Sequence, residues 1–327
     1  MTASPSGLLT GTDPALQASV NAGLEQVEAR LRDVVRSAHP LLTETAAHLV
    51  DAGGKRFRPL LTLLAAHLGG GVSDDVVDAA VVVELTHLAT LYHDDVMDEA
   101  RVRRGAQSAN TRWTNTVAIL TGDYLFARAS DLTAGLGTEA THLQSRTFAR
   151  LVEGQIAETA GPSEHEDPIV HHLQVLADKT GSLIATSARL GAMMAGVDRE
   201  VVDVLAEYGE VIGVAFQLSD DLIDVLSESG QSGKTPGTDL REGIATLPVL
   251  LAQDDPALMA VLGGDLSTDA ALDKALQALR VHPAVDLARE RMTAYVDRAR
   301  EIALSLPEGA ARQALVSLAD YVLARTG

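Results

Sequence analysis

Two clusters of three aspartates, each inside an apolar helical stretch, restrict the fold of this chain more than any other feature. They occupy residues 94–98 (D-D-V-M-D) and 220–224 (D-D-L-I-D), so both follow the pattern D-D-x-x-D. Positions i, i+1 and i+4 of a helix share one face, which places three carboxylates within one turn. Like charges this close are unfavourable unless a cation or a proton relieves them. We therefore expect the two clusters to face each other across a helical bundle.

The cation that best suits two such clusters is Mg²⁺. This ion takes oxygen ligands, keeps several waters and is commonly shared with substrate phosphates. A single D-D-x-x-D is more often a solvated helix face or a cap. Two copies in apolar helices, with basic motifs elsewhere in the chain, instead predict a Mg²⁺-dependent enzyme that acts on diphosphates.

The rest of the chain predicts an all-α protein. Of its 327 residues, 46% are hydrophobic, and helical periodicity runs almost from end to end without an alternating strand pattern. No Pro/Gly/Ser-rich linker divides the chain, so we expect a flexible tail over 1–13 and one catalytic domain over 14–327, a single large helical bundle around a central cavity. Helices are expected over 14–37, 40–52, 56–68, 74–99, 115–134, 138–160, 166–195, 198–228, 242–254, 269–279, 283–305 and 308–325.

Composition excludes several other classes of protein. With 26 basic and 45 acidic residues the formal net charge is −19, which disfavours nucleic acid as a partner. The absence of cysteine excludes disulfides, thiol catalysis and cysteine-ligated zinc. No signal peptide is evident, and no apolar run approaches the ~20 residues that span a bilayer. We expect a cytoplasmic protein without stable membrane insertion.

A polar stripe extends the first aspartate cluster along its helix. His87, Asp94 and Asp98 lie at i, i+7 and i+11, which is one face of a helix. A lone histidine is more often a hydrogen-bonded core residue, but its register with the aspartates favours a site. Gln217 stands in similar register before the second cluster. The candidate cations are Lys55 and Arg58 in G-G-K-R-F-R-P, Arg103 and Arg104 in R-R-G, Lys179 in K-T-G, and Lys234 in a loop of small residues.

These motifs together resemble the trans-isoprenyl diphosphate synthase (polyprenyl synthetase) family, and within it the bacterial long-chain all-trans synthases. The resemblance runs from about residue 53 to 248. It is carried by G-G-K-R-F-R-P (53–59), H-x₆-D-D-V-M-D (87–98), R-R-G (103–105), K-T-G (179–181), F-Q-L-S-D-D-L-I-D (216–224) and G-K-x-x-G-x-D-L-x-x-G (233–243). It implies an all-α isoprenoid-synthase fold, a homodimer, and head-to-tail condensation of isopentenyl diphosphate with an allylic diphosphate.

The resemblance also implies residue roles. Metal ligands would be Asp94, Asp98, Asp220, Asp224 and Asp239, with three Mg²⁺ ions per active site and with Asp95 and Asp221 in support. The allylic diphosphate would be held by Arg103, Lys179 and Lys234. Isopentenyl diphosphate would be held by Lys55, Arg58, His87 and Arg104. Thr180 and Gln217 match positions beside the reacting carbon.

Two departures from the family pattern stand out. Many members have a lysine where this chain has Ile244, so one phosphate contact is expected to be missing. Many also have proline soon after R-R-G, where this chain has Ala106-Gln107. We expect weaker substrate binding at most.

Product length depends on the residues that precede the first cluster. The growing tail should run along this helix, past Ala89, Thr90 and then Thr86, and bulky aromatics at such positions act as a floor in members that make short products. All three side chains are small here, which favours a long product of roughly C30 to C50, of the kind that becomes a quinone side chain. A C20 synthase is the runner-up.

Three further alternatives stay open. A class I terpene cyclase would share the ionisation chemistry but lacks a second diphosphate substrate, so G-G-K-R-F-R-P argues against it. A non-catalytic subunit of a heteromeric synthase should have lost site residues, and this chain keeps nearly all of them. A structural bundle without a ligand would not need so many charges in apolar helices.

Overall fold

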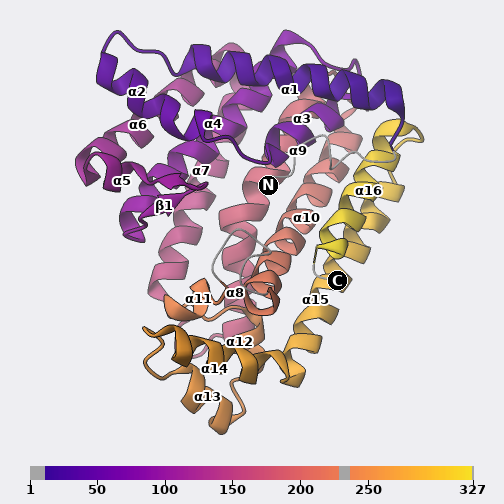
Figure 1. Ribbon diagram of the computed structural model, residues 1–327. Helices are drawn as coiled ribbons and strands as arrows, with labels where there is room; N and C mark the ends of the chain where they lie inside the picture. The colour runs from indigo at the N-terminus through magenta and orange to yellow at the C-terminus, as the bar shows by residue number, and fades with distance from the viewer. Residues whose placement is uncertain (1–11, 228–235, 326–327) are drawn as a thin grey trace.

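The computed structural model describes residues 12–227 and 236–325, which fold into an almost entirely helical protein (Figure 1). In chain order the elements are α1 (Pro14–Val34), α2 (Pro40–Asp51), α3 (Phe57–Ala66), α4 (Asp74–Met97), β1 (Val102–Arg103), β2 (Ala106–Gln107), α5 (Ala109–Arg112), α6 (Asn115–Gly135), α7 (Thr138–Ala160), α8 (Pro168–Leu176), the π-helical turn η2 (Ala177–Gly181), α9 (Ser182–Met194), α10 (Arg199–Leu226), α11 (Thr238–Arg241), α12 (Leu247–Leu251), α13 (Pro256–Leu262), α14 (Asp269–Arg280), α15 (Pro283–Leu304) and α16 (Ala310–Ala324). The all-α prediction is confirmed. The division into a tail and one domain stays a prediction.

The helix expected over 242–254 is wrong. α11 ends at Arg241, a turn follows, and only α12 (Leu247–Leu251) forms within that range. Gly243 follows α11 in the left-handed region at φ 76°, a conformation that glycine adopts at little cost after a helix. Pro248 is tolerated only in the first turn of a helix, so α12 begins at Leu247.

A small hairpin was also not expected. β1 and β2 pair antiparallel, with Val102 opposite Gln107 and Arg103 opposite Ala106. The two residues between them, Arg104 and Gly105, have φ of 53° and 78°. Two successive positive φ values are what a type I′ hairpin turn requires. The strands are too short to show an alternating pattern, so only the Arg-Gly pair could have signalled the turn.

Helix α4, which carries the first aspartate cluster, lies inside the bundle. It packs on α1, α3, α6 and α9, and α10 packs on α9 and α15. In Figure 1, α1 crosses one end of the bundle, while α13 and α14 cover the other. By length and composition α4 could cross a membrane, which the sequence analysis did not anticipate, but 72% of its apolar window is buried inside the protein. Its hydrophobicity is accounted for by that burial.

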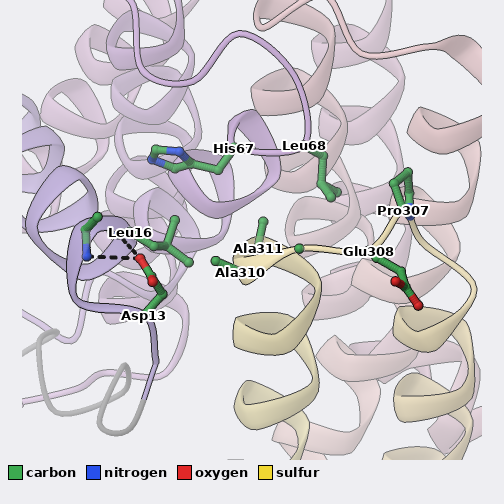
Figure 2. A pocket seen from close by; sticks show the side chains of 10 residues that line it. Asp13, Leu16, His67, Leu68, Pro307, Glu308, Ala310 and Ala311 are labelled. Atoms are coloured by element: carbon green, nitrogen blue, oxygen red, sulfur yellow. Dashed lines mark hydrogen bonds between the residues drawn. The ribbon is translucent and has the colours of Figure 1, made fainter.

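A surface cavity of about 360 Å³ lies between the start of α1, the end of α3 and the turn from α15 to α16 (Figure 2). Asp13 borders it and caps α1 by accepting hydrogen bonds from the backbone amides of Ala15 and Leu16 at 3.0 and 2.9 Å. None of the lining residues is a predicted site residue. The cavity is at the opposite end of α3 from Arg58, so it is separate from the candidate active site.

Candidate active site

The first aspartate cluster forms the C-terminal end of α4. Asp95 is fully buried, and its Oδ1 accepts a hydrogen bond of 2.6 Å from Nε of Arg103. Arg103 also approaches Asp98, at 3.9 Å. Burial, together with the charge of Asp98, raises the pKa of Asp94 to about 6. Burial likewise raises the pKa of Asp98. Burial thus disfavours the charged forms of Asp94 and Asp98.

Lys179 is a second cation, besides Arg103, near the first aspartate cluster. Its positive charge opposes the rise in pKa of both Asp94 and Asp98. Nζ of Lys179 forms an ion pair with Glu158 of α7. A Cβ on Gly154, one turn earlier, would lie only 3.0 Å from the backbone nitrogen of Lys179, so glycine lets α7 approach η2 this closely. Glu158 was missed by the sequence analysis, because nothing local marks it.

The π turn η2 joins α8 to α9 and packs on α7 and α10. It interrupts the run from α8 to α9 where K-T-G stands, and such turns are frequent at functional sites. Lys179 points toward the first cluster, while the hydroxyl of the next residue, Thr180, lies 3.5 Å from Oε1 of Gln217 on α10. The predicted pair Thr180 and Gln217 therefore does meet, between the two clusters.

Each aspartate of the second cluster has different partners. Asp220 forms an ion pair with Arg325 near the end of α16. Oδ2 of buried Asp221 is 3.1 Å from Nε2 of His172 on α8, which is partly buried. Asp224 accepts backbone hydrogen bonds of 3.2 Å from Thr238 and Asp239. Asp239 is therefore brought to the cluster as predicted. His172 and Arg325 were missed, because their contacts join segments far apart in sequence.

Two other predicted positions are less informative. Lys234 lies outside the described residues. Ile244 is 42% exposed, and its backbone amide donates to the carbonyl of Asp239 at 2.8 Å. The expected loss of a phosphate contact at Ile244 stays a prediction.

A basic cluster of Arg58, His87 and Arg104 lies near the first aspartate cluster. Burial lowers the pKa of Arg58 to about 10, with a contribution from the charge of Arg104, so Arg58 remains protonated at neutral pH. Burial and the neighbouring Arg58 and Arg104 hold the pKa of His87 well below its usual range. His87 is therefore neutral and can still donate a hydrogen bond. The structure brings together three of the four residues predicted to hold isopentenyl diphosphate.

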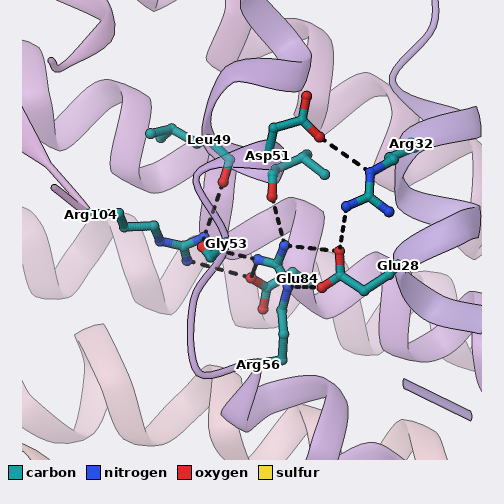
Figure 3. A network of polar contacts seen from close by, with 9 residues as sticks. Glu28, Arg32, Leu49, Asp51, Gly53, Arg56, Glu84 and Arg104 are labelled. Atoms are coloured by element: carbon teal, nitrogen blue, oxygen red, sulfur yellow. Dashed lines mark hydrogen bonds and ion pairs between the residues drawn. The ribbon is translucent and has the colours of Figure 1, made fainter. Parts of the chain in front are cut away.

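Glu84 is the buried counter-charge of this basic cluster (Figure 3). Its side chain is 2% exposed, and its Oε1 accepts from Arg56 at 2.8 Å and from Arg104 at 3.5 Å. Arg56 also pairs with Glu28 at 2.5 Å, and Arg104 donates to the carbonyl oxygens of Gly53 and Leu49. Glu84 was missed, although it stands three residues before His87 on the same stripe.

The fourth predicted residue, Lys55, lies on a different side of the site. Its Nζ is 5.9 Å from the ring centroid of Phe216, and the guanidinium carbon of Arg325 is 4.2 Å from the same ring. Phe216 also contacts Phe57, with ring centroids 5.1 Å apart. Phe216 lies on α10, and Arg325 also pairs with Asp220. The turn that carries Lys55 is therefore close to the second aspartate cluster.

The carboxylates suit a divalent cation that is shared with a substrate. Within residues 12–227 and 236–325, no three Asp, Glu or His side chains converge as a ready-made metal cage. Oδ2 of Asp95 is buried without a hydrogen-bond partner among the described residues, and burial raises the pKa of Asp94. A bound cation would favour the ionised form of both carboxyl groups. Hard oxygen ligands with room for water and phosphate oxygens are what Mg²⁺ prefers.

The pKa of Asp94 leads to a prediction about pH. A proton and a metal ion compete for this carboxylate, so affinity for Mg²⁺ should fall as the pH drops below about 6. We expect Mg²⁺ to bind about tenfold more weakly at pH 5 than at pH 7. The measurement is a Mg²⁺ titration of the melting temperature at several pH values. Asp94→Asn should flatten the pH dependence, and an equally steep dependence in that variant would contradict the assignment.

Comparison with known proteins gives consistent matches over nearly the whole chain. Residues 39–279 match the family described as polyprenyl synthetase. The chain is 48% identical over 321 residues to the nonaprenyl diphosphate synthase of Mycobacterium tuberculosis, covering 96% of each protein. It is similar to the crystal structure of a decaprenyl diphosphate synthase from Rhodobacter capsulatus, with 35% identity, a TM-score of 0.87, and 96% of this chain and 99% of that chain covered. A geranylgeranyl pyrophosphate synthase from Corynebacterium glutamicum, complexed with calcium and isoprenyl diphosphate, gives 44% identity, a TM-score of 0.86, and coverage of 96% and 98%.

Proposed function

This chain belongs to the polyprenyl synthetase family, and on that premise we propose that it condenses isopentenyl diphosphate head-to-tail with an allylic diphosphate to build an all-trans polyprenyl diphosphate. It is a prenyltransferase. The observation that carries the proposal is that a carboxylate cluster near Lys179 lies beside a separate basic cluster around Arg58. Two anionic substrates can be held side by side by such an arrangement.

The allylic diphosphate is assigned to the side of the carboxylates. Asp94 and Asp98 would hold Mg²⁺ from α4, and Asp220, with Asp224 and Asp239 nearby, would hold it from α10, three ions in all. Bound Mg²⁺ would act as a Lewis acid that stabilises the departing diphosphate. Lys179 and Arg103 would exchange their present carboxylate partners for phosphate oxygens, which accept charge-assisted hydrogen bonds.

Isopentenyl diphosphate is assigned to the basic cluster of Arg58, His87 and Arg104. Arg58 remains cationic there, and neutral His87 can donate a hydrogen bond without adding charge. Lys55 is the fourth assigned residue. Its position by Phe216 puts it nearer the second cluster, where it could reach the same diphosphate from the opposite side.

The reaction itself needs protection from water more than it needs a protein base. Carbon–oxygen cleavage leaves an allylic carbocation, which the double bond of isopentenyl diphosphate attacks. Thr180 and Gln217 would border this point from η2 and α10. The departing diphosphate would accept the proton lost at the end. Exclusion of water prevents capture of the cation as an alcohol.

A long product, about C30 to C50, agrees with the small residues along α4 and with the nonaprenyl and decaprenyl relatives. Thr90 lies one turn before Asp94 on the same face, and Thr86 one turn further. Ala89 instead belongs to a fully buried apolar cluster with Leu88 and Tyr92, which packs toward α2 and α6. Of the predicted positions, Thr90 and Thr86 are therefore the better candidates for the wall of the tail's path.

A bulky residue at Thr90 should shorten the product. Thr90→Phe places a rigid ring about 6 Å from Asp94 along α4, and we expect products of about C15 to C20 with catalysis retained. Ala89→Phe is the matched comparison, because its ring would press into the α6 contact and cost about 1–3 kcal/mol of stability. Chromatographic sizing of the products and a thermal melt check both. Unchanged length in a folded Thr90→Phe variant would show that the tail takes another path.

We also propose a homodimer in the cytoplasm. Four large apolar side chains are exposed on α6 and α7, namely Ile119 (42%), Leu120 (59%), Val152 (43%) and Ile156 (63%). α6 and α7 pack antiparallel, and the ring centroids of Phe126 and Phe148 lie 4.2 Å apart. This pairing places the four exposed side chains at a similar height along the two helices. A second copy of the chain would bury them. A monomer by light scattering at micromolar concentration would contradict the dimer.

The decisive experiment is turnover with defined substrates. The purified chain should elongate allylic primers only when isopentenyl diphosphate and Mg²⁺ are both present, and sizing should give long all-trans products. Consumption of primer without isopentenyl diphosphate would favour a terpene cyclase. A dominant C20 product would favour the geranylgeranyl alternative, and no turnover without another protein would favour a subunit of a heteromeric synthase.

A further inference from the structure

The π turn η2, which carries Lys179, lies tightly between α7 and α10. A Cβ on Gly154 of α7 would lie 2.9 Å from Cβ of Asp178, and a Cβ on Gly213 of α10 would lie 2.7 Å from Cα of Gly181. Glycine therefore lets both helices contact the turn closely. The turn holds one residue more than the same stretch of α-helix, so its location sets the direction of its side chains. A shift by one residue would rotate a side chain by about 100°.

The backbone of the turn changes its hydrogen-bond pattern at Asp178. The amide of Ser182 donates to the carbonyl oxygen of Ala177, five residues earlier, where an α-helix would direct it to Asp178. The hydroxyl of Ser182 instead donates to the carbonyl oxygen of Asp178 at 2.6 Å. Whatever fixes Asp178 therefore also fixes the place of the π turn in the chain.

One guanidinium group fixes the side chain of Asp178. Nε and Nη2 of Arg150 on α7 each lie 2.8 Å from Oδ1 of Asp178. The same group donates to both carboxylate oxygens of Glu210 on α10, at 3.1 and 2.5 Å. Gln174 of α8 donates to Oδ2 of Asp178 at 2.8 Å. A planar guanidinium can hold two carboxylates in one fixed geometry, which the point charge of a lysine cannot.

These contacts lie one residue before the lysine that is assigned to the allylic diphosphate. We propose that Arg150 is a positioning residue for that substrate: it holds Asp178, and with it the π turn, so that Lys179 stays near Asp94 and Asp98. The inference rests on the proposed function. The alternative is that Arg150 only ties α7 to α10, in which case its loss would lower stability without a preference for one substrate.

Two variants break the link from its two ends. Arg150→Gln removes the charge and the paired hydrogen bonds, and Asp178→Ala removes the acceptor on the turn. Each should lower kcat/KM for the allylic primer by about 10- to 100-fold, the scale for a catalytic group misplaced by about 1 Å. The KM for isopentenyl diphosphate should stay near that of the original chain, because Lys179 is not assigned to that substrate. Arg150→Lys keeps the charge without the planar geometry, so its loss should be smaller.

A double variant separates positioning from general damage. If Arg150 acts through Lys179, Arg150→Gln should add little to the effect of Lys179→Ala, whereas independent effects would multiply. Arg298→Gln is the matched control, because Arg298 also bonds two carboxylates, those of Glu207 on α10 at 2.6 Å and Glu301 on α15 at 3.3 Å. Neither partner belongs to η2, so kcat/KM for the primer should equal that of the original chain.

Melting temperatures show which variants fold. Unchanged kcat/KM for the primer in folded Arg150→Gln or Asp178→Ala would overturn the proposal. So would multiplied effects in the double variant, an equal loss for both substrates, or an equal loss in Arg298→Gln. Failure of the proposed function is distinct, since the original chain would then make no prenyl product.

Discussion

Replacing Asp94 or Asp220 with alanine should lower kcat by at least about 100-fold, the scale for losing a major electrostatic contact in the transition state. Each residue stands at the start of an aspartate cluster, and the two clusters reach the same region through Lys179, Thr180 and Gln217. Removal of Mg²⁺ with a chelator should abolish turnover of the unmodified chain, and added Mg²⁺ should restore it. Steady-state kinetics over a range of Mg²⁺ concentrations give both results.

A control separates the loss of a ligand from the loss of a charge. Asp75 is exposed near the start of α4, far from the cluster, so Asp75→Ala changes net charge equally and should leave kcat within about twofold. Asp220→Ala also frees Arg325 from its ion pair, so its melting temperature must be compared with that of Asp94→Ala. Full activity in excess chelator, or in folded Asp94→Ala, would refute metal-dependent catalysis at this site.

The sequence predicted the parts of the site that depend on local spacing. Helical periodicity placed His87, Asp94 and Asp98 on one face of one helix, and the structure keeps them there. The same reasoning could have included Glu84, three residues earlier, because a carboxylate inside V-V-V-E-L needs a buried partner. It could not identify that partner as Arg56, because spacing reports the face of a helix and not the segment that packs against it.

Contacts between distant segments were therefore beyond the sequence. Arg325 reaches Asp220 across 105 positions, and His172 reaches Asp221 across 49. Similarly, Ala89 and Thr90 are adjacent in sequence, but the helix turns them about 100° apart, so Ala89 joins the core while Thr90 remains on the face of Asp94. The start of α12 at Leu247 does follow from local chemistry, because Pro248 is tolerated only in the first turn of a helix. The apolar residues around Pro248 match a longer helix and conceal this boundary.

The other large effect is expected from Glu84. This carboxylate is buried between Arg56 and Arg104, and its charge raises the pKa of nearby Arg58 against the effect of burial. Breaking a buried ion pair by removing one partner leaves uncompensated charge in a poorly solvated place, which costs about 3–5 kcal/mol. We therefore expect Glu84→Ala to lower the free energy of unfolding by about that amount, measured by urea denaturation with the slope compared between variants.

Two further variants show whether charge is the cause. Glu84→Gln keeps an acceptor oxygen but removes the charge, so its loss of stability should be intermediate. Glu28 pairs with the same Arg56 but is partly exposed, so Glu28→Gln should cost only about 0–1 kcal/mol. If Glu84→Ala were as stable as the original chain, the arginines would not depend on this carboxylate.

The same variant also tests the proposed diphosphate site at Arg58 and Arg104. A ligand that binds only the folded state stabilises it in proportion to its affinity. With Glu84 absent, the guanidinium groups of Arg56, Arg58 and Arg104 lack their buried counter-charge, and an anionic ligand at Arg58 and Arg104 would supply one. Inorganic diphosphate should therefore raise the melting temperature of Glu84→Ala more than that of the original chain, and Arg58→Ala in the same background should remove the difference. An equal rise in both proteins would place the diphosphate away from Arg58, because only a ligand next to the unpaired arginines can offset the missing carboxylate.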